Sequence, residues 1–266
     1  MALLCLSFSA SAGEGRKRIS LAQPTGIYSD EDIQHELLFG REMAAILLAD
    51  RKLSNDPNLN RYVNLVGHAI ARHANRPELT FYFAVVESPQ INAYAVPGGY
   101  IFITSAAMAR MRNEAELAGV LAHEIAHVTD RHIVKALDIR ADDNSVTAIA
   151  GKIVAQNAAT ANVVFYQTID KAFALLYRTG LAAEDEYDAD LQGLFLTALT
   201  GYDPHAFVRF LERIAPEIST RGELNSTHPP FQARVERLNE HIDKLGLEGQ
   251  GGIKFLLKRA ALIIPP

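Results

Sequence analysis

The strongest constraint on this chain is the run at residues 113–135, NEAELAGVLAHEIAHVTDRHIVK, which contains His123, Glu124 and His127 in the spacing H-E-x-x-H. The run begins with Asn-x-x-Glu, a pattern typical of a helix N-cap with a capping box. Its apolar residues then recur at helical intervals. The sequence therefore predicts one buried helix over residues 113–135.

Such a helix places both histidines on one face. Side chains four residues apart lie one helical turn, roughly 6 Å, apart, so both imidazoles can reach one tetrahedral Zn²⁺. Glu124 lies about 100° around the helix from His123 and faces the same space without being a ligand. A carboxylate in that place can take a proton from an attacking water molecule. The alternative is an amphipathic helix that happens to carry two surface histidines, because a motif this short also arises by chance.

A zinc hydrolase needs a third protein ligand. The metzincin pattern would require Gly at position 130 and His at position 133, where this chain has Asp130 and Ile133. His132 is half a turn out of phase with His123, so it is expected to face away in a supporting or structural role. The remaining candidate for the third ligand is a carboxylate that lies far from this helix in the sequence.

The acidic cluster at residues 184–190, EDEYDAD, can supply that carboxylate. Glu186 and Asp190 are four apart and share a helical face. Glu186 could complete the metal site, while Asp190 could accept the free N–H of a ligating imidazole. The alternative is an acidic first turn that the helix dipole favours without any metal.

The composition limits which other classes of protein and of metal site are possible. At 266 residues and 48% hydrophobic, the chain can bury a core in one domain. A net charge of -5 without a long basic run makes nucleic acid an unexpected partner. Cys5 is the only cysteine, so a metal would be held by histidine and carboxylate.

Residues 1–12 contain a short apolar run that ends in Ala-Ser-Ala, as before a secretory cleavage site, although the positively charged start is missing. They are interpreted as the remnant of a signal peptide, with a disordered apolar tail as the alternative. Residues 13–27 are expected to be a flexible lead-in. The sequence contains no uninterrupted stretch of about 18 apolar residues, so no transmembrane helix is expected. An exported chain without cysteine pairs suits a bacterial periplasm.

The remaining pattern predicts a mainly helical α+β fold. Helices are expected at 29–51, 57–73 and 182–200, from Asp203-Pro204 onward, and up to Leu245. Short strands are expected at 80–86, 91–96 and 100–104, directly before the histidine helix. Residues 140–180 are mostly helical in pattern and are expected to form a lid over the site, and residues 246–266 are expected to form a C-terminal tail.

Four motifs in this order, NAYAVPGGYIFIT, HEIAHVTDRH, EYDAD and HPPFQAR, closely resemble family forty-eight of the zinc metallopeptidases, which are gluzincins. The resemblance covers residues 33–245 and implies a peptidase domain at 28–245. It implies one zinc ion per chain, bound by His123, His127 and Glu186, with Glu124 as general base and Asp190 supporting a ligand.

The resemblance also implies roles outside the zinc helix. The strand with Asn92, Ala93 and Tyr94 would bind the substrate backbone, because an extended peptide can add to a sheet edge as one more strand. His228 and Arg234 would act near the zinc. His228 could stabilise the oxyanion, or it could fill the open zinc position and hold the enzyme inactive.

The sequence predicts no membrane helix, and in this respect it resembles the soluble periplasmic branch of that family. The expected location is therefore the periplasm, either free or associated with a membrane. The expected activity is an endopeptidase for misfolded or misassembled envelope proteins, with the outer-membrane assembly machinery as candidate partner. The chain after Leu245 is too short for the tetratricopeptide repeats found in that branch. Two alternatives remain: a chaperone-like or regulatory zinc protein kept closed by His228, and an aminopeptidase.

Overall fold

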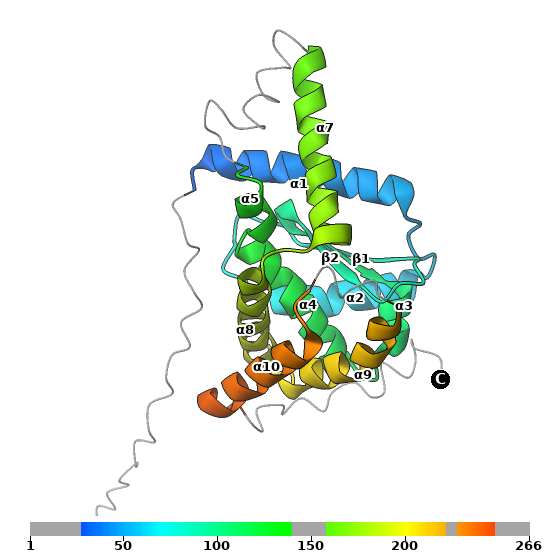
Figure 1. Ribbon diagram of the computed structural model, residues 1–266, viewed down its shortest axis with the longest axis vertical. Helices are drawn as coiled ribbons and strands as arrows, with labels where there is room; N and C mark the ends of the chain where they lie inside the picture. The colour runs from blue at the N-terminus through cyan, green and yellow to red at the C-terminus, as the bar shows by residue number, and fades with distance from the viewer. Residues whose placement is uncertain (1–27, 140–157, 222–227, 248–266) are drawn as a thin grey trace, which may run out of the picture.

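The computed structural model describes residues 28–139, 158–221 and 228–247. The expected signal remnant at 1–12, the lead-in at 13–27 and most of the tail at 246–266 lie outside these ranges, as does the first part of the predicted covering segment. The described elements follow one another along the chain (Figure 1). They are α1 (Asp30–Asp50), α2 (Pro57–Ala71), β1 (Tyr82–Val86), β2 (Ala93–Val96), the 3-10 turn η1 (Pro97–Gly99), β3 (Tyr100–Thr104), α3 (Ser105–Arg110), α4 (Glu114–Thr129), α5 (His132–Ala136), α7 (Ala158–Ala174), the π-helical turn η2 (Leu175–Thr179), α8 (Ala183–Leu199), α9 (His205–Arg221) and α10 (Phe231–Leu245).

Three short strands form a mixed sheet in the order β1-β3-β2. β1 runs parallel to β3, and β2 runs antiparallel to it. β2 is therefore an edge strand. The prediction of a mainly helical α+β fold with a small sheet is confirmed. β1 and β2 each begin two residues later than expected, whereas β3 has its expected bounds.

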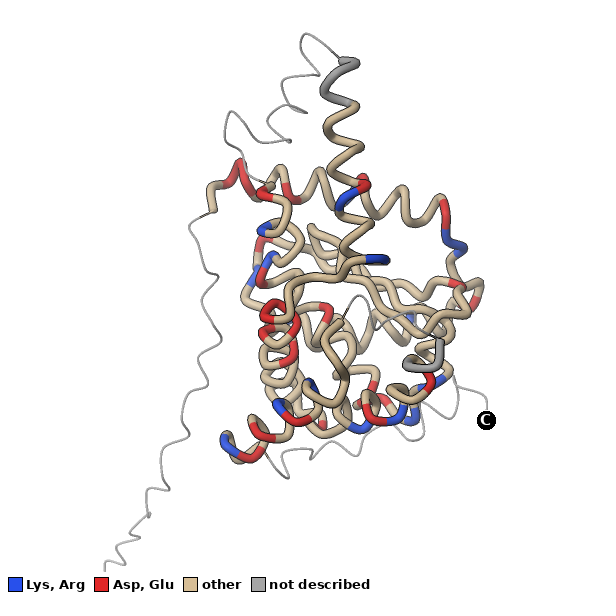
Figure 2. Tube along the Cα trace, in the orientation of Figure 1, with Lys and Arg blue, Asp and Glu red and all other residues tan. Residues whose placement is uncertain are grey.

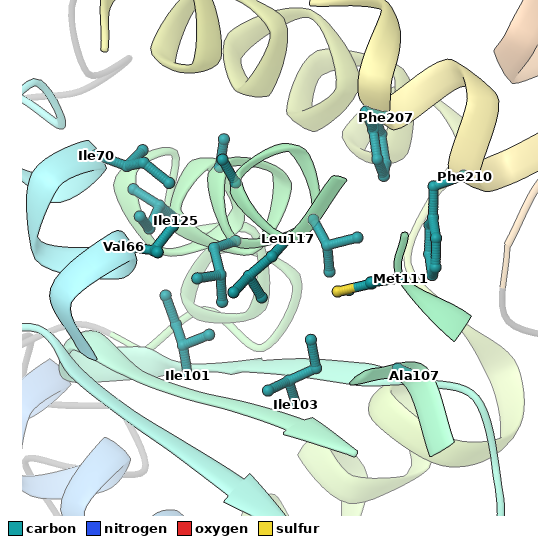
Figure 3. Packing of buried hydrophobic residues seen from close by; sticks show 14 of the residues in the cluster. Val66, Ile70, Ile101, Ile103, Ala107, Met111, Leu117, Ile125, Phe207 and Phe210 are labelled. Atoms are coloured by element: carbon teal, nitrogen blue, oxygen red, sulfur yellow. The ribbon is translucent and has the colours of Figure 1, made fainter. Parts of the chain in front are cut away.

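Helices cover both faces of the sheet, and alternation along β3 shows why. Successive side chains of a strand point to opposite faces. Ile101 and Ile103 pack toward α4 and α2, whereas Phe102 packs with α1 and α7 (Figures 1 and 3). Because both faces are buried, the three central residues of the strand, Ile101, Phe102 and Ile103, are all apolar. The charged residues lie mainly on the helices that surround the sheet (Figure 2).

α4 is the central helix. Asn113 caps it by accepting a hydrogen bond from the Glu116 backbone N–H at 3.0 Å, as the sequence predicted. Leu117 faces the sheet, Ile125 lies beside Val66 and Ile70 of α2, and Phe207 and Phe210 of α9 approach from another side (Figure 3).

The prediction of one helix over 113–135 is wrong. α4 ends at Thr129, and Arg131 adopts a left-handed conformation with φ 57° before α5 begins at His132. This conformation costs a non-glycine residue about 1–2 kcal/mol. Here the Arg131 guanidinium donates to the buried carboxylate of Glu36 at 2.8 Å and lies 3.6 Å from the Tyr28 ring centroid. These contacts hold the turn in place.

Among the residues that the structure describes, no helix is both long enough and apolar enough to cross a bilayer.

Candidate metal centre

Two helices far apart in sequence, α4 and α8, pack closely and form the centre of the site (Figure 1). Gly193 of α8 permits this approach, because a Cβ there would lie 2.9 Å from the backbone nitrogen of His123. Glu186, two turns earlier on α8, is thereby brought beside the histidine face of α4. Figure 2 shows the acidic first turns of α8 to which it belongs.

His123, His127 and Glu186 converge with their potential ligand atoms all within 4.8 Å of one another. The two Nε2 atoms are 3.1 Å apart. Glu186 Oε1 lies 3.5 Å from His127 Nε2, and Oε2 lies 3.8 Å from His123 Nε2. All three side chains are buried. Two imidazoles and one carboxylate are a typical donor set of catalytic zinc, so the residues present fit that ion.

The surroundings favour the protonation states of ligands for two of these groups. Burial tends to raise the pKa of Glu186, but His228, His127 and Arg234 together hold it well below its usual range. Burial lowers the pKa of His127 well below its usual value. An ionised carboxylate and a neutral imidazole both bind metal without first losing a proton.

His123 differs because Asp190 lies behind it. Its Nδ1–H donates to Asp190 Oδ1 at 3.0 Å. Burial lowers the pKa of His123, but this bond and the negative charges of Asp190 and Glu186 together outweigh burial and raise the pKa. Arg234 in turn donates to both oxygens of Asp190, from Nε at 2.9 Å and from Nη2 at 2.6 Å. The proton on Nδ1 leaves Nε2 as the metal-facing nitrogen.

Glu124 lies beside these groups without belonging to the three-residue cluster. It is 8% exposed and lines both of the larger cavities near the site. Burial raises the pKa of its carboxyl group, and the nearby positive groups only partly offset this. A carboxylate with a raised pKa is suited to accept and return a proton near neutral pH.

His228 stands at the mouth of the cluster, directly before α10. Its Nδ1–H donates to Glu186 Oε2 at 2.6 Å, and its side chain is 22% exposed. Arg234 is more deeply placed, with its Nη1 atom 3.7 Å from Glu186 Oε2. The structure thus brings both HPPFQAR residues to the same carboxylate.

Two open cavities meet at Glu124 and His228, which line both of them. Asn92 and Ala93, at the start of the edge strand β2, line both. Tyr94 does not line either one. Its side chain points to the opposite face of the sheet, where its ring contacts Tyr177 at 5.0 Å between centroids.

The walls of the cavities are largely apolar, and no sequence pattern indicates them directly. The larger cavity is bounded by α9 and the smaller by the π-helical turn η2. Periodicity in α9 could have indicated an apolar face but not which site it borders. The apolar wall residues are Phe207, Phe210, Leu211 and Ile214 for the larger cavity, and Ile133, Leu175, Leu176 and Leu181 for the smaller one.

His132 does not face away as the helical phase suggested. Its Nδ1 lies 2.8 Å from Nδ1 of His127, and it is buried. The helix breaks at Arg131, and the direction in which His132 points changes there. A helical phase counted through residue 132 therefore predicts the wrong direction for this side chain.

Comparison with known proteins agrees with this site. The chain is 32% identical over 218 residues to the beta-barrel assembly-enhancing protease of Yersinia pestis, covering 80% of this chain and 45% of that protein. It is 30% identical over 216 residues to the protein of that name from Escherichia coli strain K12, covering 79% and 44%.

A more distant relative is the mitochondrial metalloendopeptidase OMA1 of Arabidopsis thaliana, 25% identical over 241 residues, with 87% of this chain and 43% of that protein covered. The chain thus spans less than half the length of these relatives. The model of Peptidase family M48 matches residues 57–242, which include every residue of the cluster. The protein therefore belongs to peptidase family M48.

Proposed function

We propose that this chain is a zinc-dependent endopeptidase with one Zn²⁺ held by His123, His127 and Glu186. The observation that carries the proposal is the convergence of these three buried side chains beside Glu124, at the junction of two cavities. When bound, zinc supplies a Lewis acid that polarises the scissile carbonyl and lowers the pKa of water to about 7.

Glu124 is the proposed general base. It takes a proton from the attacking water and later delivers that proton to the leaving amine. Its burial supports this role, because a raised pKa makes the carboxylate a stronger base for the proton of the attacking water.

The edge of β2 is the proposed binding strand for the substrate. A peptide that adds to this edge would pair through its backbone, and its scissile bond would lie beside Glu124. Asn92 and Ala93 would contact it at the cavities, and Tyr94 would contribute backbone groups only, since its side chain points to the other face.

His228 and Arg234 complete the proposed catalytic residues. His228 could donate a hydrogen bond to the oxyanion of the tetrahedral intermediate once its Nδ1–H leaves Glu186. Arg234 lines the larger cavity while it holds Asp190, which orients His123.

The proposed substrates are misfolded or misassembled proteins of the cell envelope, and the proposed compartment is the periplasm. The name of the relatives from Yersinia pestis and Escherichia coli, beta-barrel assembly-enhancing protease, supports this choice and makes the outer-membrane assembly machinery the candidate partner.

Casein digestion tests the peptidase. Wild-type protein is expected to cleave casein internally, and Glu124→Gln is expected to lose that cleavage while it retains one zinc per chain. Undiminished cleavage by Glu124→Gln, or by wild type after complete chelation, would contradict the proposal. Release of single N-terminal residues would indicate an aminopeptidase instead.

The contact between His228 and Glu186 favours a second candidate, a chaperone-like or regulatory zinc protein whose site is kept closed. It predicts that neither wild type nor His228→Ala cleaves casein while partner binding is intact. A His228-controlled peptidase predicts measurable cleavage by at least one of the two proteins.

A further inference from the structure

We propose that His132 is a positioning residue that fixes the proton of His127 on Nδ1 and aims its Nε2 at the metal. This inference rests on the zinc site proposed above. The carrying observation is the 2.8 Å separation between His127 Nδ1 and His132 Nδ1, both in buried side chains. The two rings meet edge to face, with centroids 4.9 Å apart and planes at 79°.

The requirement comes from the two nitrogens of His127. Its Nε2 atom faces His123 and Glu186, at 3.1 and 3.5 Å, so this nitrogen must present its lone pair to a metal. A neutral imidazole has one N–H and one acceptor nitrogen, so the proton must then reside on Nδ1. The atom opposite Nδ1 must be an acceptor.

His132 Nδ1 can be that acceptor when the His132 proton is on its own Nε2. That nitrogen faces Asp185, whose Oδ1 atom lies 3.9 Å away, too far for a direct hydrogen bond but close enough to favour an N–H over a lone pair. The direction of hydrogen bonding then runs from His127 to His132, with the negative charge of Asp185 at the outer end.

The backbone supports the same assignment. His132 reaches His127 only because Arg131 takes the left-handed conformation. Glu36 of α1 holds that arginine and also accepts from Arg76 at 2.9 Å, while Arg76 donates to the Val128 carbonyl at 3.0 Å. A buried ion cluster thus stabilises the turn that brings the second imidazole behind the first.

The two ligating histidines are therefore supported differently. His123 donates to a carboxylate, Asp190, at 3.0 Å, whereas His127 donates to an imidazole. A supporting partner of either kind commonly changes metal affinity by about 10- to 100-fold when it is lost.

The test compares zinc affinity, by competition with a chromophoric chelator and without substrate, in wild type, His132→Asn and His132→Leu. Asparagine keeps an acceptor near the position of Nδ1, whereas leucine removes it. We expect His132→Leu to bind zinc about 10- to 100-fold more weakly and His132→Asn to recover most of that loss. Val134→Ala, a buried apolar truncation in the same helix, is the control for general loss of stability.

Equal zinc affinity of wild type and a folded His132→Leu would overturn the inference and leave the peptidase proposal intact. Equal losses in His132→Leu, His132→Asn and Val134→Ala would overturn it as well, because packing alone would explain them. Absence of zinc binding by wild type would instead defeat the proposed function, on which the inference depends.

If leucine prevents folding, nitrogen-15 spectra of the histidine rings in metal-free wild type replace that variant. A proton on Nδ1 of His127 supports the inference, and a proton on Nδ1 of His132 in that bond overturns it.

Discussion

Asp190 and Arg234 show how a charged pair can be stable in the interior of the site. The guanidinium donates to both carboxylate oxygens, which is the strongest common geometry for such a pair. Asp190 accepts a third bond, from His123. Because the two charges neutralise each other through two hydrogen bonds, the pair holds an imidazole in one orientation instead of acting as an unpaired buried charge.

Asp130, at the end of α4, is less well compensated and makes folding sensitive to pH. Burial raises its pKa to about 6, and Lys135 and Arg76 offset burial only in part. A carboxyl group whose pKa is raised on folding contributes stability below its unfolded pKa of 3.8, and this contribution is lost as pH rises through about 6.

Asp130→Asn is neutral at every pH, so it should become more stable than wild type as pH rises. We expect its advantage to be about 2 kcal/mol larger near pH 8 than near pH 4.5. Urea unfolding of both metal-free proteins at the two pH values measures this. The same difference in unfolding free energy at both values would contradict the prediction.

At the level of helices, local signals were sufficient where the cause is local. The helices α1, α2 and α8 begin within one residue of their expected starts, and Ser29 and Asp56 cap the first two. A cap depends on a side chain and a backbone N–H only two or three residues apart, so the sequence alone can reveal it.

The end of α4 had a distant cause and was missed. Arg131 leaves the helix because Glu36, 95 residues earlier, binds its side chain. The same limit applies to the cluster, where Glu186 followed from resemblance and spacing, whereas His132 behind His127 did not. Neither the hydropathy nor the helical period of the sequence indicates the contact between Arg131 and Glu36 that resets the helical phase.

The close packing of α4 and α8 predicts that Gly193 is needed for metal binding. In Gly193→Ala the new methyl group would lie 2.9 Å from His123 N, a backbone atom that cannot rotate away. The helices must separate, which moves Glu186 away from the histidines. We expect zinc affinity to fall at least about tenfold and stability to fall by about 1–3 kcal/mol.

Chelator competition and urea unfolding measure the two effects of Gly193→Ala. Gln192→Ala is the matched control, since it changes the neighbouring, partly buried position of the same helix. Zinc affinity equal to that of the control would show that the distance between the helices does not set the geometry of the cluster.

The whole molecule places the cluster between two apolar walls from different parts of the chain. α9 bounds the larger cavity and η2 bounds the smaller one, with Glu124 and His228 where they meet. A chain lying along β2 would extend into both cavities. This arrangement favours cleavage within a polypeptide, with an apolar side chain on each side of the scissile bond.

Each wall should therefore control one side of the cleaved bond. Phe210→Ala enlarges the α9 cavity and Leu176→Ala enlarges the η2 cavity. Sequencing of the products from a denatured protein mixture should show two separate shifts toward bulkier apolar residues, one on each side of the bond. A change of a few carbon atoms in such a pocket alters selectivity by about tenfold or more.

Leu65→Ala, a truncation of an exposed leucine on α2, should leave both preferences unchanged. If Phe210→Ala and Leu176→Ala shifted the same side, the substrate could not cross both cavities past Glu124. Binding along the β2 edge would then be wrong, even if the cluster of His123, His127 and Glu186 still held zinc. The experiment thus separates the path of the substrate from the identity of the metal site, because the apolar walls lie outside the ligand set.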